Sequence, residues 1–229
     1  MTAPVTSGTY NFAPSMGEAV LYAYGLCGVG RTALTQQHFN DARMGTNLML
    51  SAWSARGVNL WQVDLQCVQL TQGCSTYPVP PETIAMLDAY IGYQSPEIDR
   101  LILPISRTEY ASYTNKSQQG FPTTFWFDRL LSPTVTLWPV PDGTQSTFKY
   151  YRLRTVQDSV LQNGTAPEMP QYFLEAYVLG LAWRLSLIWA PARAPALKTM
   201  ADEAYAFAAN QNVETSAYYI SPQVSGYYR

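Results

Sequence analysis

The chain has 229 residues, of which 47% are hydrophobic and only 13% are Asp, Glu, Lys or Arg, with a formal net charge of −2. This length can bury one substantial core, and we expect one structural unit that carries an insertion. The near-neutral charge argues against a protein that coats DNA, because non-specific duplex binding requires many Lys and Arg side chains to neutralise phosphates.

The cysteines and the first residues indicate a protein of the reduced cytosol. Cys27, Cys67 and Cys74 cannot all pair within one chain and are too few for a disulfide framework. The opening sequence MTAPVTSGTY lacks the basic region and apolar run of a signal peptide. No apolar run approaches the ~20 residues of a membrane-spanning helix, so we expect no contact with a membrane.

Residues 1–60 are predicted to form an arm, over residues 1–16, followed by two helices. The first helix is expected from about Glu18 to Cys27. The second begins after Thr35, a suitable N-cap residue, and Gly57 is a natural stop. Its apolar residues recur at helical spacing, at Phe39, Ala42, Met49, Ala52 and Trp53.

Residues 61–160 are predicted to form a small antiparallel β module. Apolar and polar residues alternate from Trp61 to Cys67, and the slip of the alternation at Val68 suggests a β-bulge. The segment Thr83–Tyr93 suits a strand or a short helix, and we favour a strand. Clearer strands are predicted over residues 123–129, 134–138 and 147–156.

Residues 161–212 are predicted to form a helical hairpin that packs with the early helices. Pro170 suits the first turn of a helix whose broad apolar face extends to Trp189. Pro191 and Pro195 separate it from a second helix that ends near Ala209. The predicted fold class is therefore α+β and mainly helical: an antiparallel helical bundle with an inserted small antiparallel β module and an extended C-terminal tail.

Residues 213–229 are predicted to form that tail, and their composition indicates docking. The segment contains two Tyr-Tyr pairs and is charged only at Glu214 and Arg229. An ordinary disordered tail would carry few aromatic residues. We therefore expect this segment to bind another surface.

The sequence has few residues in the arrangements that catalysis or metal binding requires. We therefore predict no enzyme activity, cofactor or metal site. His38 is the only histidine, and a solvated pair with Asp41 at the start of a helix explains it best. The cysteines have no Cys-x-x-Cys spacing for zinc. A hydrolase would need two acids at a set separation, and the candidate acids are scattered, at Glu82, Asp88, Glu97, Asp99 and Glu109.

The aromatic residues favour either assembly or sugar binding. Six Trp and seventeen Tyr can stack on sugars or anchor protein interfaces. Trp61, Trp126 and Trp138 are the better contact candidates, but residue type does not separate the two functions. Arg152 and Arg154 lie on one side of a predicted strand and could touch phosphate, although a solvated strand face explains them more simply.

Three blocks between about Glu18 and Asn210 carry a resemblance to a known family. The first block contains Asn47, Leu48, Met49, Leu50, Trp53, Gly57, Leu60 and Trp61. The second contains Ile105, Ser106, Arg107, Glu109, Tyr110, Lys116, Gly120, Phe121, Pro122, Phe125 to Arg129 and Leu137 to Pro141. The third contains Tyr150, Tyr151, Arg152, Pro170, Ala182, Leu185, Ala192 and Arg193. In this order and spacing, the blocks resemble the head-to-tail adaptor (connector) proteins of tailed bacteriophages, of the short-tailed phage tail accessory type.

The resemblance implies a structural protein of the virion, made in the cytoplasm of the host bacterium and located at the head–tail junction. Such adaptors form a ring, usually dodecameric, beneath the portal protein. They extend the channel for double-stranded DNA, help to retain the packaged genome and receive tail tube or nozzle proteins. The smallest adaptors of short-tailed phages are nearly all helical, and the long β insertion departs from them. The alternative is a carbohydrate-binding or cell-wall-degrading tail component.

The resemblance also implies roles for named residues. In related adaptors the C-terminal segment reaches into the portal, so the predicted portal-binding residues are Tyr218, Tyr219, Ile220, Tyr227, Tyr228 and Arg229. The predicted subunit or tail interface comprises Trp61, Phe121, Trp126 and Trp138. Arg152 and Arg154 are candidates for lining the DNA channel.

Overall fold

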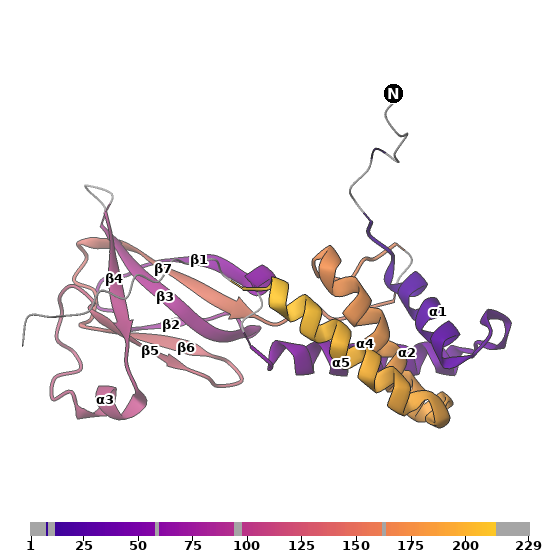
Figure 1. Cartoon of the computed structure of the whole chain (residues 1–229). Coiled ribbons are helices and arrows are strands. Elements are labelled where there is room, and N and C mark those ends of the chain that lie inside the picture. The colour runs from indigo at the N-terminus through magenta and orange to yellow at the C-terminus, as the bar shows by residue number, and fades with distance from the viewer. Residues whose placement is uncertain (1–7, 9–11, 58–59, 94–97, 162–163, 214–229) are drawn as a thin grey trace, which may run out of the picture.

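The computed structural model describes residues 8, 12–57, 60–93, 98–161 and 164–213. Figure 1 shows an elongated molecule with a twisted β-sheet at one end and a group of helices at the other. The chain begins in the helical part, crosses into the sheet after residue 60, and returns to the helices after residue 154. Each part has its own cluster of buried apolar side chains.

The first two helices begin at side-chain caps, of which the sequence analysis predicted Thr35. Helix α1 (Met16–Cys27) starts with a capping box, in which the Glu18 amide donates to Ser15 Oγ at 3.2 Å and the Ser15 amide donates to Glu18 Oε2 at 2.8 Å. It ends at Gly28, whose φ of 83° is the left-handed conformation that glycine adopts readily. Helix α2 (Gln36–Ser54) starts at Thr35, and both helices confirm the sequence prediction.

The helical hairpin is confirmed as well. After a 3₁₀ turn over Gln171–Phe173, helix α4 (Leu174–Trp189) is followed by a second 3₁₀ turn and by helix α5 (Ala194–Gln211). Helix α4 is central, because α1, α2 and α5 all pack against it. The largest fully buried side chains of this part are those of Tyr24, Met49, Phe173, Tyr177, Leu181 and Leu185.

Among the described residues, the β part is a seven-stranded sheet with the order β1-β7-β3-β4-β5-β6-β2. Its strands are β1 (Val63–Gln69), β2 (Thr76–Pro78), β3 (Thr83–Tyr93), β4 (Asp99–Pro104), β5 (Thr124–Asp128), β6 (Thr134–Trp138) and β7 (Gln145–Arg154). The strands pair antiparallel except for β4 and β5, which pair in parallel at Leu103–Thr124 and Pro104–Phe125. The sheet encloses its own apolar core, with Ile91, Ile102, Phe125, Leu137, Phe148 and Tyr150 almost completely buried.

The predicted fold class, a mainly helical bundle with a small antiparallel β module, is wrong. The strands form a large mixed sheet, and the helices make up only one of the two packed parts. Sequence reasoning missed β2, β4 and the short helix α3 (Arg107–Ser112). In β4 only Ile102 is buried, so buried and exposed residues do not alternate along this strand. Hydrogen bonding to β3 on one side and to β5 on the other holds it in the sheet.

Most of the individual strand predictions are confirmed, although the fold class is wrong. The strand over residues 83–93 is confirmed, as are those near residues 123–129, 134–138 and 147–156. The β-bulge expected at Val68 is wrong, because β1 pairs with β7 in unbroken register from Val63–Leu153 to Gln69–Thr147. The irregularities lie instead where β3 pairs with β7. The boundaries near residues 60, 160 and 212 stay predictions.

Candidate assembly surfaces

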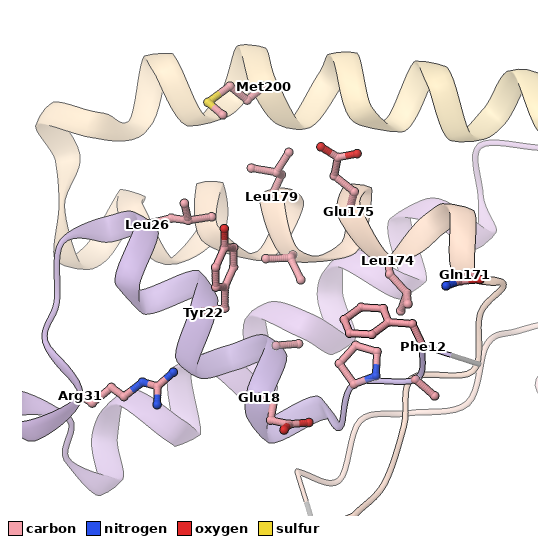
Figure 2. A pocket seen from close by; sticks show the side chains of 14 residues that line it. Phe12, Glu18, Tyr22, Leu26, Arg31, Gln171, Leu174, Glu175, Leu179 and Met200 are labelled. Carbon is pink, nitrogen blue, oxygen red and sulfur yellow. The ribbon is translucent and has the colours of Figure 1, made fainter. Parts of the chain in front are cut away.

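An apolar groove opens between α1 and α5, with α4 as its floor and with Phe12 of the segment before α1 at one end (Figure 2). Its volume is about 930 Å³. Tyr22 from α1 and Met200 from α5 line its sides and are 63% and 47% exposed. Leu174 and Val178 of α4 also line the groove and are partly buried. Exposed apolar side chains around a hollow are typical of a protein-binding surface.

Charged side chains stand at the rim of this groove. Glu18 and Glu175 carry negative charge there, and Arg31 supplies a positive charge near the start of the turn that follows α1. The hydrogen bonds from the Ser15 amide and hydroxyl lower the pKa of Glu18, so this carboxylate is held in its charged form. The groove therefore combines an apolar floor with a mainly acidic rim.

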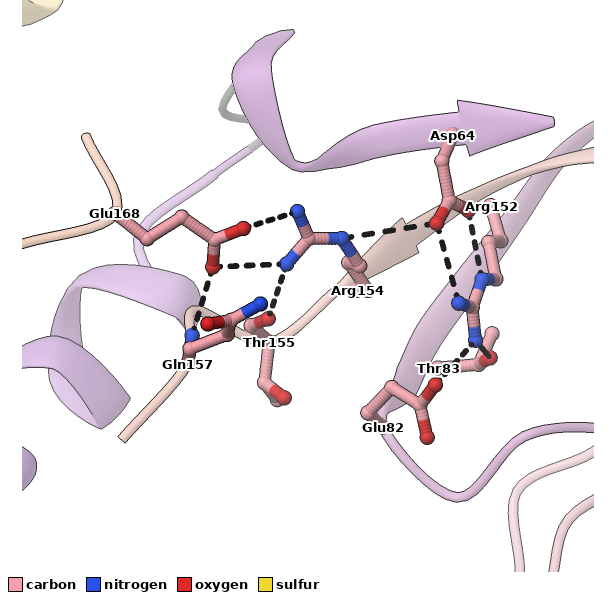
Figure 3. A network of polar contacts seen from close by, with 8 residues as sticks. All are labelled: Asp64, Glu82, Thr83, Arg152, Arg154, Thr155, Gln157 and Glu168. Atoms are coloured by element: carbon pink, nitrogen blue, oxygen red, sulfur yellow. Dashed lines mark hydrogen bonds and ion pairs between the residues drawn. The ribbon is translucent and has the colours of Figure 1, made fainter. Parts of the chain in front are cut away.

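A network of ion pairs lies where the sheet meets the helical part (Figure 3). Arg152 on β7 donates to Asp64 on β1 through Nε at 2.7 Å and Nη2 at 3.1 Å. Its Nη1 donates to Glu82 Oε1 and to Thr83 Oγ1, both at 3.0 Å. The Arg152 side chain is only 6% exposed. This guanidinium thus links β1, β7 and the start of β3.

Arg154 extends the network to the connection that leads into α4. Its Nη1 donates to Glu168 Oε2 at 3.0 Å, and its Nε lies 3.6 Å from Asp64 Oδ2. The hydrogen bonds and charge of Arg152 lower the pKa of Asp64. Burial alone would raise the pKa of Glu168, but the hydrogen bonds from Arg154 and from the Gln157 amide reverse this effect and lower it.

The predicted proximity of Arg152 and Arg154 to DNA stays a prediction. The structure confirms that the two side chains lie on one side of the strand, because both reach Asp64. The expected solvated strand face is wrong for Arg152, whose side chain is buried. Two guanidinium groups and three carboxylates (Asp64, Glu82 and Glu168) leave the network with a formal charge of −1, so it has no surplus positive charge to offer a phosphate.

Two of the predicted interface residues form an aromatic ladder with α3. The rings of Tyr113 and Trp138 lie 4.1 Å apart, and those of Tyr110 and Trp126 lie 5.5 Å apart. Trp138 Nε1 donates to the Asn115 carbonyl at 3.1 Å, which holds the segment after α3 against β6. Each of these four aromatic residues is partly exposed, so part of the ladder is accessible to solvent.

Phe121 and Trp61, the other predicted interface residues, are held by contacts within the chain. Phe121 stacks on Tyr93 with ring centres 5.1 Å apart, and the Arg100 guanidinium lies over its ring. Trp61 packs against Phe173 at 4.5 Å and joins the helical core, partly buried. Their roles at an interface stay predictions. The predicted portal-binding residues Tyr218, Tyr219, Ile220, Tyr227, Tyr228 and Arg229 lie outside the described residues.

The hairpin between β5 and β6 presents an apolar tip that sequence reasoning missed. Leu131 is 100% exposed and Leu130 is also exposed. Two adjacent leucines between Arg129 and Ser132, where turn residues are usually polar, were the available signal. A leucine pair that no described residue covers is suited to bind a partner protein.

The outer face of the sheet carries a second exposed apolar surface. Leu65 on β1 pairs directly with Tyr151 on β7, and Tyr90 on β3 pairs directly with Leu101 on β4. The two pairs meet where the Tyr90 and Tyr151 rings touch edge to face, 6.5 Å apart. Cross-strand neighbours share a face, so these residues form one continuous stripe across four strands.

His38 has a structural place rather than the solvated one expected from the sequence. It is buried, its ring stacks on Trp189 at 3.8 Å, and its Nδ1 accepts from the Thr35 amide at 3.2 Å. Among the described residues, no three His, Cys, Asp or Glu side chains come together as a metal site. Within the same residues, no helix is both long and apolar enough to cross a membrane.

Comparison with known proteins identifies the family. No curated protein matches the chain. The SU10 adaptor protein family matches residues 31–225, which include α2, the whole sheet and the hairpin of α4 and α5. The chain therefore belongs to the SU10 adaptor protein family, which confirms its resemblance to the head-to-tail adaptors of tailed bacteriophages.

Proposed function

We propose that this chain is a structural protein of the phage head–tail junction that forms a ring beneath the portal protein. Membership of the adaptor family supports a structural role in the virion. The observation that carries the ring proposal is the distribution of exposed apolar surface, which occurs on the helices as the groove and on the sheet as the Leu130–Leu131 tip and the Leu65–Tyr151 stripe. A subunit of a ring needs separate contact surfaces for its neighbours and for the proteins above and below.

In this ring, the helical part would contact neighbouring copies and the sheet would face a neighbour or the tail. The Leu130–Leu131 tip and the aromatic ladder are the surfaces of the sheet that fit a tail tube or nozzle protein. The assembled ring would extend the DNA channel and help to retain the packaged genome. Residues 213–229 would anchor the ring to the portal through their tyrosines.

Electron microscopy of the purified full-length chain, with and without the purified portal protein of the same phage, tests this function. The expected result is a ring of the chain on the portal, and no equivalent particle when the portal is absent. A chain that stays monomeric in the presence of portal and turns over or binds a cell-wall glycan would contradict the proposal. That outcome would favour a carbohydrate-binding or cell-wall-degrading tail component.

A further inference from the structure

The groove between α1 and α5 has a counterpart on the opposite side of the helical part. Helix α2 packs against α4 through the face that carries Ala42, Thr46, Met49 and Trp53. Met44 and Leu48, four residues apart, lie on the other face of α2 and are 61% and 54% exposed. In Figure 1, α2 passes behind α4 and α5. The outward apolar residues of α2 and the groove therefore face in opposite directions across α4.

The charges beside these two surfaces are complementary. Exposed Arg43 flanks Met44 and Leu48 on one side of α2, and Asp41 flanks them on the other. The groove carries Glu175 at one rim and Arg31 at another. In the described part of the chain, none of these four charged groups forms an ion pair with another side chain. Each surface thus carries charges of both signs, and Arg43 and Asp41 on α2 can pair with Glu175 and Arg31 at the groove.

We propose that the groove receives the α2 face of a second copy of this chain, with Met44 and Leu48 on its apolar floor and Arg43 beside Glu175. Two different, complementary patches on opposite sides of a subunit produce a head-to-tail contact, which closes into a ring when the rotation between copies allows it. This inference rests on the proposed ring and assigns its subunit interface to the helical part. Apolar contact would supply the affinity, and the charged pairs would set the register.

Charge reversal tests the interface in the full-length chain mixed with portal. Glu175→Arg and Arg43→Glu each place like charges together, so each single variant should reduce the yield of rings by about tenfold or more. The double variant restores opposite charges in exchanged positions and should recover most of the yield. Asp202→Arg is the matched control, because Asp202 is an exposed acid on α5 that does not line the groove. Its ring yield should stay within about twofold of wild type.

Circular dichroism and thermal unfolding of each variant show whether the folded monomer is retained, which is expected because all these side chains are at the surface. Wild-type ring yields from both single variants, or a double variant that stays as defective as the singles, would overturn this interface. Glu175→Arg copies that still associate with one another but no longer join the portal would also overturn it, because the groove would then bind portal. A wild-type chain that forms no ring at all would instead contradict the proposed function.

Discussion

Arg152 stabilises the fold as a nearly buried charge whose partners come from different strands. Its two hydrogen bonds to Asp64 are the bidentate geometry that a guanidinium forms with a carboxylate, and its Nη1 donates to both Glu82 and Thr83. Removing the arginine would leave Asp64 at the joint without its main partner. Since Asp64 is still 35% exposed, solvent would screen part of this penalty.

We predict that Arg152→Met lowers the free energy of unfolding by about 2–3 kcal/mol at pH 7, measured by urea denaturation. Arg152→Lys should recover only part of this loss, because an ammonium group cannot form the bidentate contact. A stability equal to that of wild type would show that the ion pairs contribute no net free energy.

The same network makes part of the stability depend on pH. The pKa values of Asp64 and Glu168 are lower in the folded chain than their ordinary values, so the unfolded chain binds more protons when acid is added. The two carboxylates make their full contribution to the free energy of unfolding above about pH 5. This contribution is lost as the pH falls through their lowered pKa values. Arg152 lowers the pKa of Asp64, whereas Glu168 is held by Arg154, so of these two contributions only that of Asp64 is lost in Arg152→Met. The stability difference between wild type and Arg152→Met should therefore shrink below about pH 4. A difference that stays constant between pH 7 and pH 3 would contradict this origin.

At the scale of elements, side-chain contacts stabilise the short helix α3. The helix has six residues, too few to be stable alone. Ser106 caps its start by accepting from the Glu109 amide at 3.1 Å, and Lys116 Nζ donates to the Ala111 and Tyr113 carbonyls at its end. The stacking of Tyr110 on Trp126, and the packing of Tyr113, which directly follows the helix, on Trp138 then fix α3 against β5 and β6.

A double-mutant cycle measures how strongly this ladder holds α3. Tyr113→Leu and Trp138→Leu should each destabilise the chain, and the two effects should be coupled by about 0.5–1.5 kcal/mol because one aromatic pair is removed in both. Chemical denaturation of the four proteins gives the coupling free energy. Strictly additive losses would mean that the two rings stack without stabilising each other.

On the scale of the whole molecule, the end of α5 places the start of the tail beside the sheet. The Leu60 amide donates to Asn212 Oδ1 at 3.0 Å, so the chain leaves α5 next to the point where it first enters the sheet. From there, residues 213–229 could extend up to roughly 55 Å, since an extended residue spans about 3.3 Å. This reach is sufficient for contact with a separate protein.

Deleting residues 213–229 should leave a folded chain that no longer joins the portal. The deletion keeps Asn212 and every described helix and strand, so thermal unfolding should resemble that of wild type. Co-sedimentation with portal measures the loss. A full-length control with Tyr218, Tyr219, Tyr227 and Tyr228 replaced by serine separates the aromatic contribution from chain length. Portal binding retained by the truncated chain would refute the portal-anchoring role of the tail.

Much of the local structure could be predicted because its causes lie close together in the sequence. Thr35 precedes α2, Pro170 precedes the turn that leads into α4, and Pro191 separates the two helices of the hairpin. The candidate site was less predictable. Trp126 and Trp138 were selected as contact candidates and are partly exposed. Their partners were not foreseen, because Tyr110 belongs to a helix that was not predicted and Tyr113 directly follows it. The groove uses residues from three helices that are far apart in the sequence.

The sequence by itself determined the main helices, most of the strands and the adaptor family, because periodicity, caps and ordered motifs depend on residues within one segment. Only the tertiary structure decided that the strands form one mixed sheet, that Arg152 is buried against Asp64, and that His38 is stacked in the helical core. These features join residues separated by tens of positions, such as Asp64 and Arg152. Their pairing depends on the packing of whole elements, which no local pattern records.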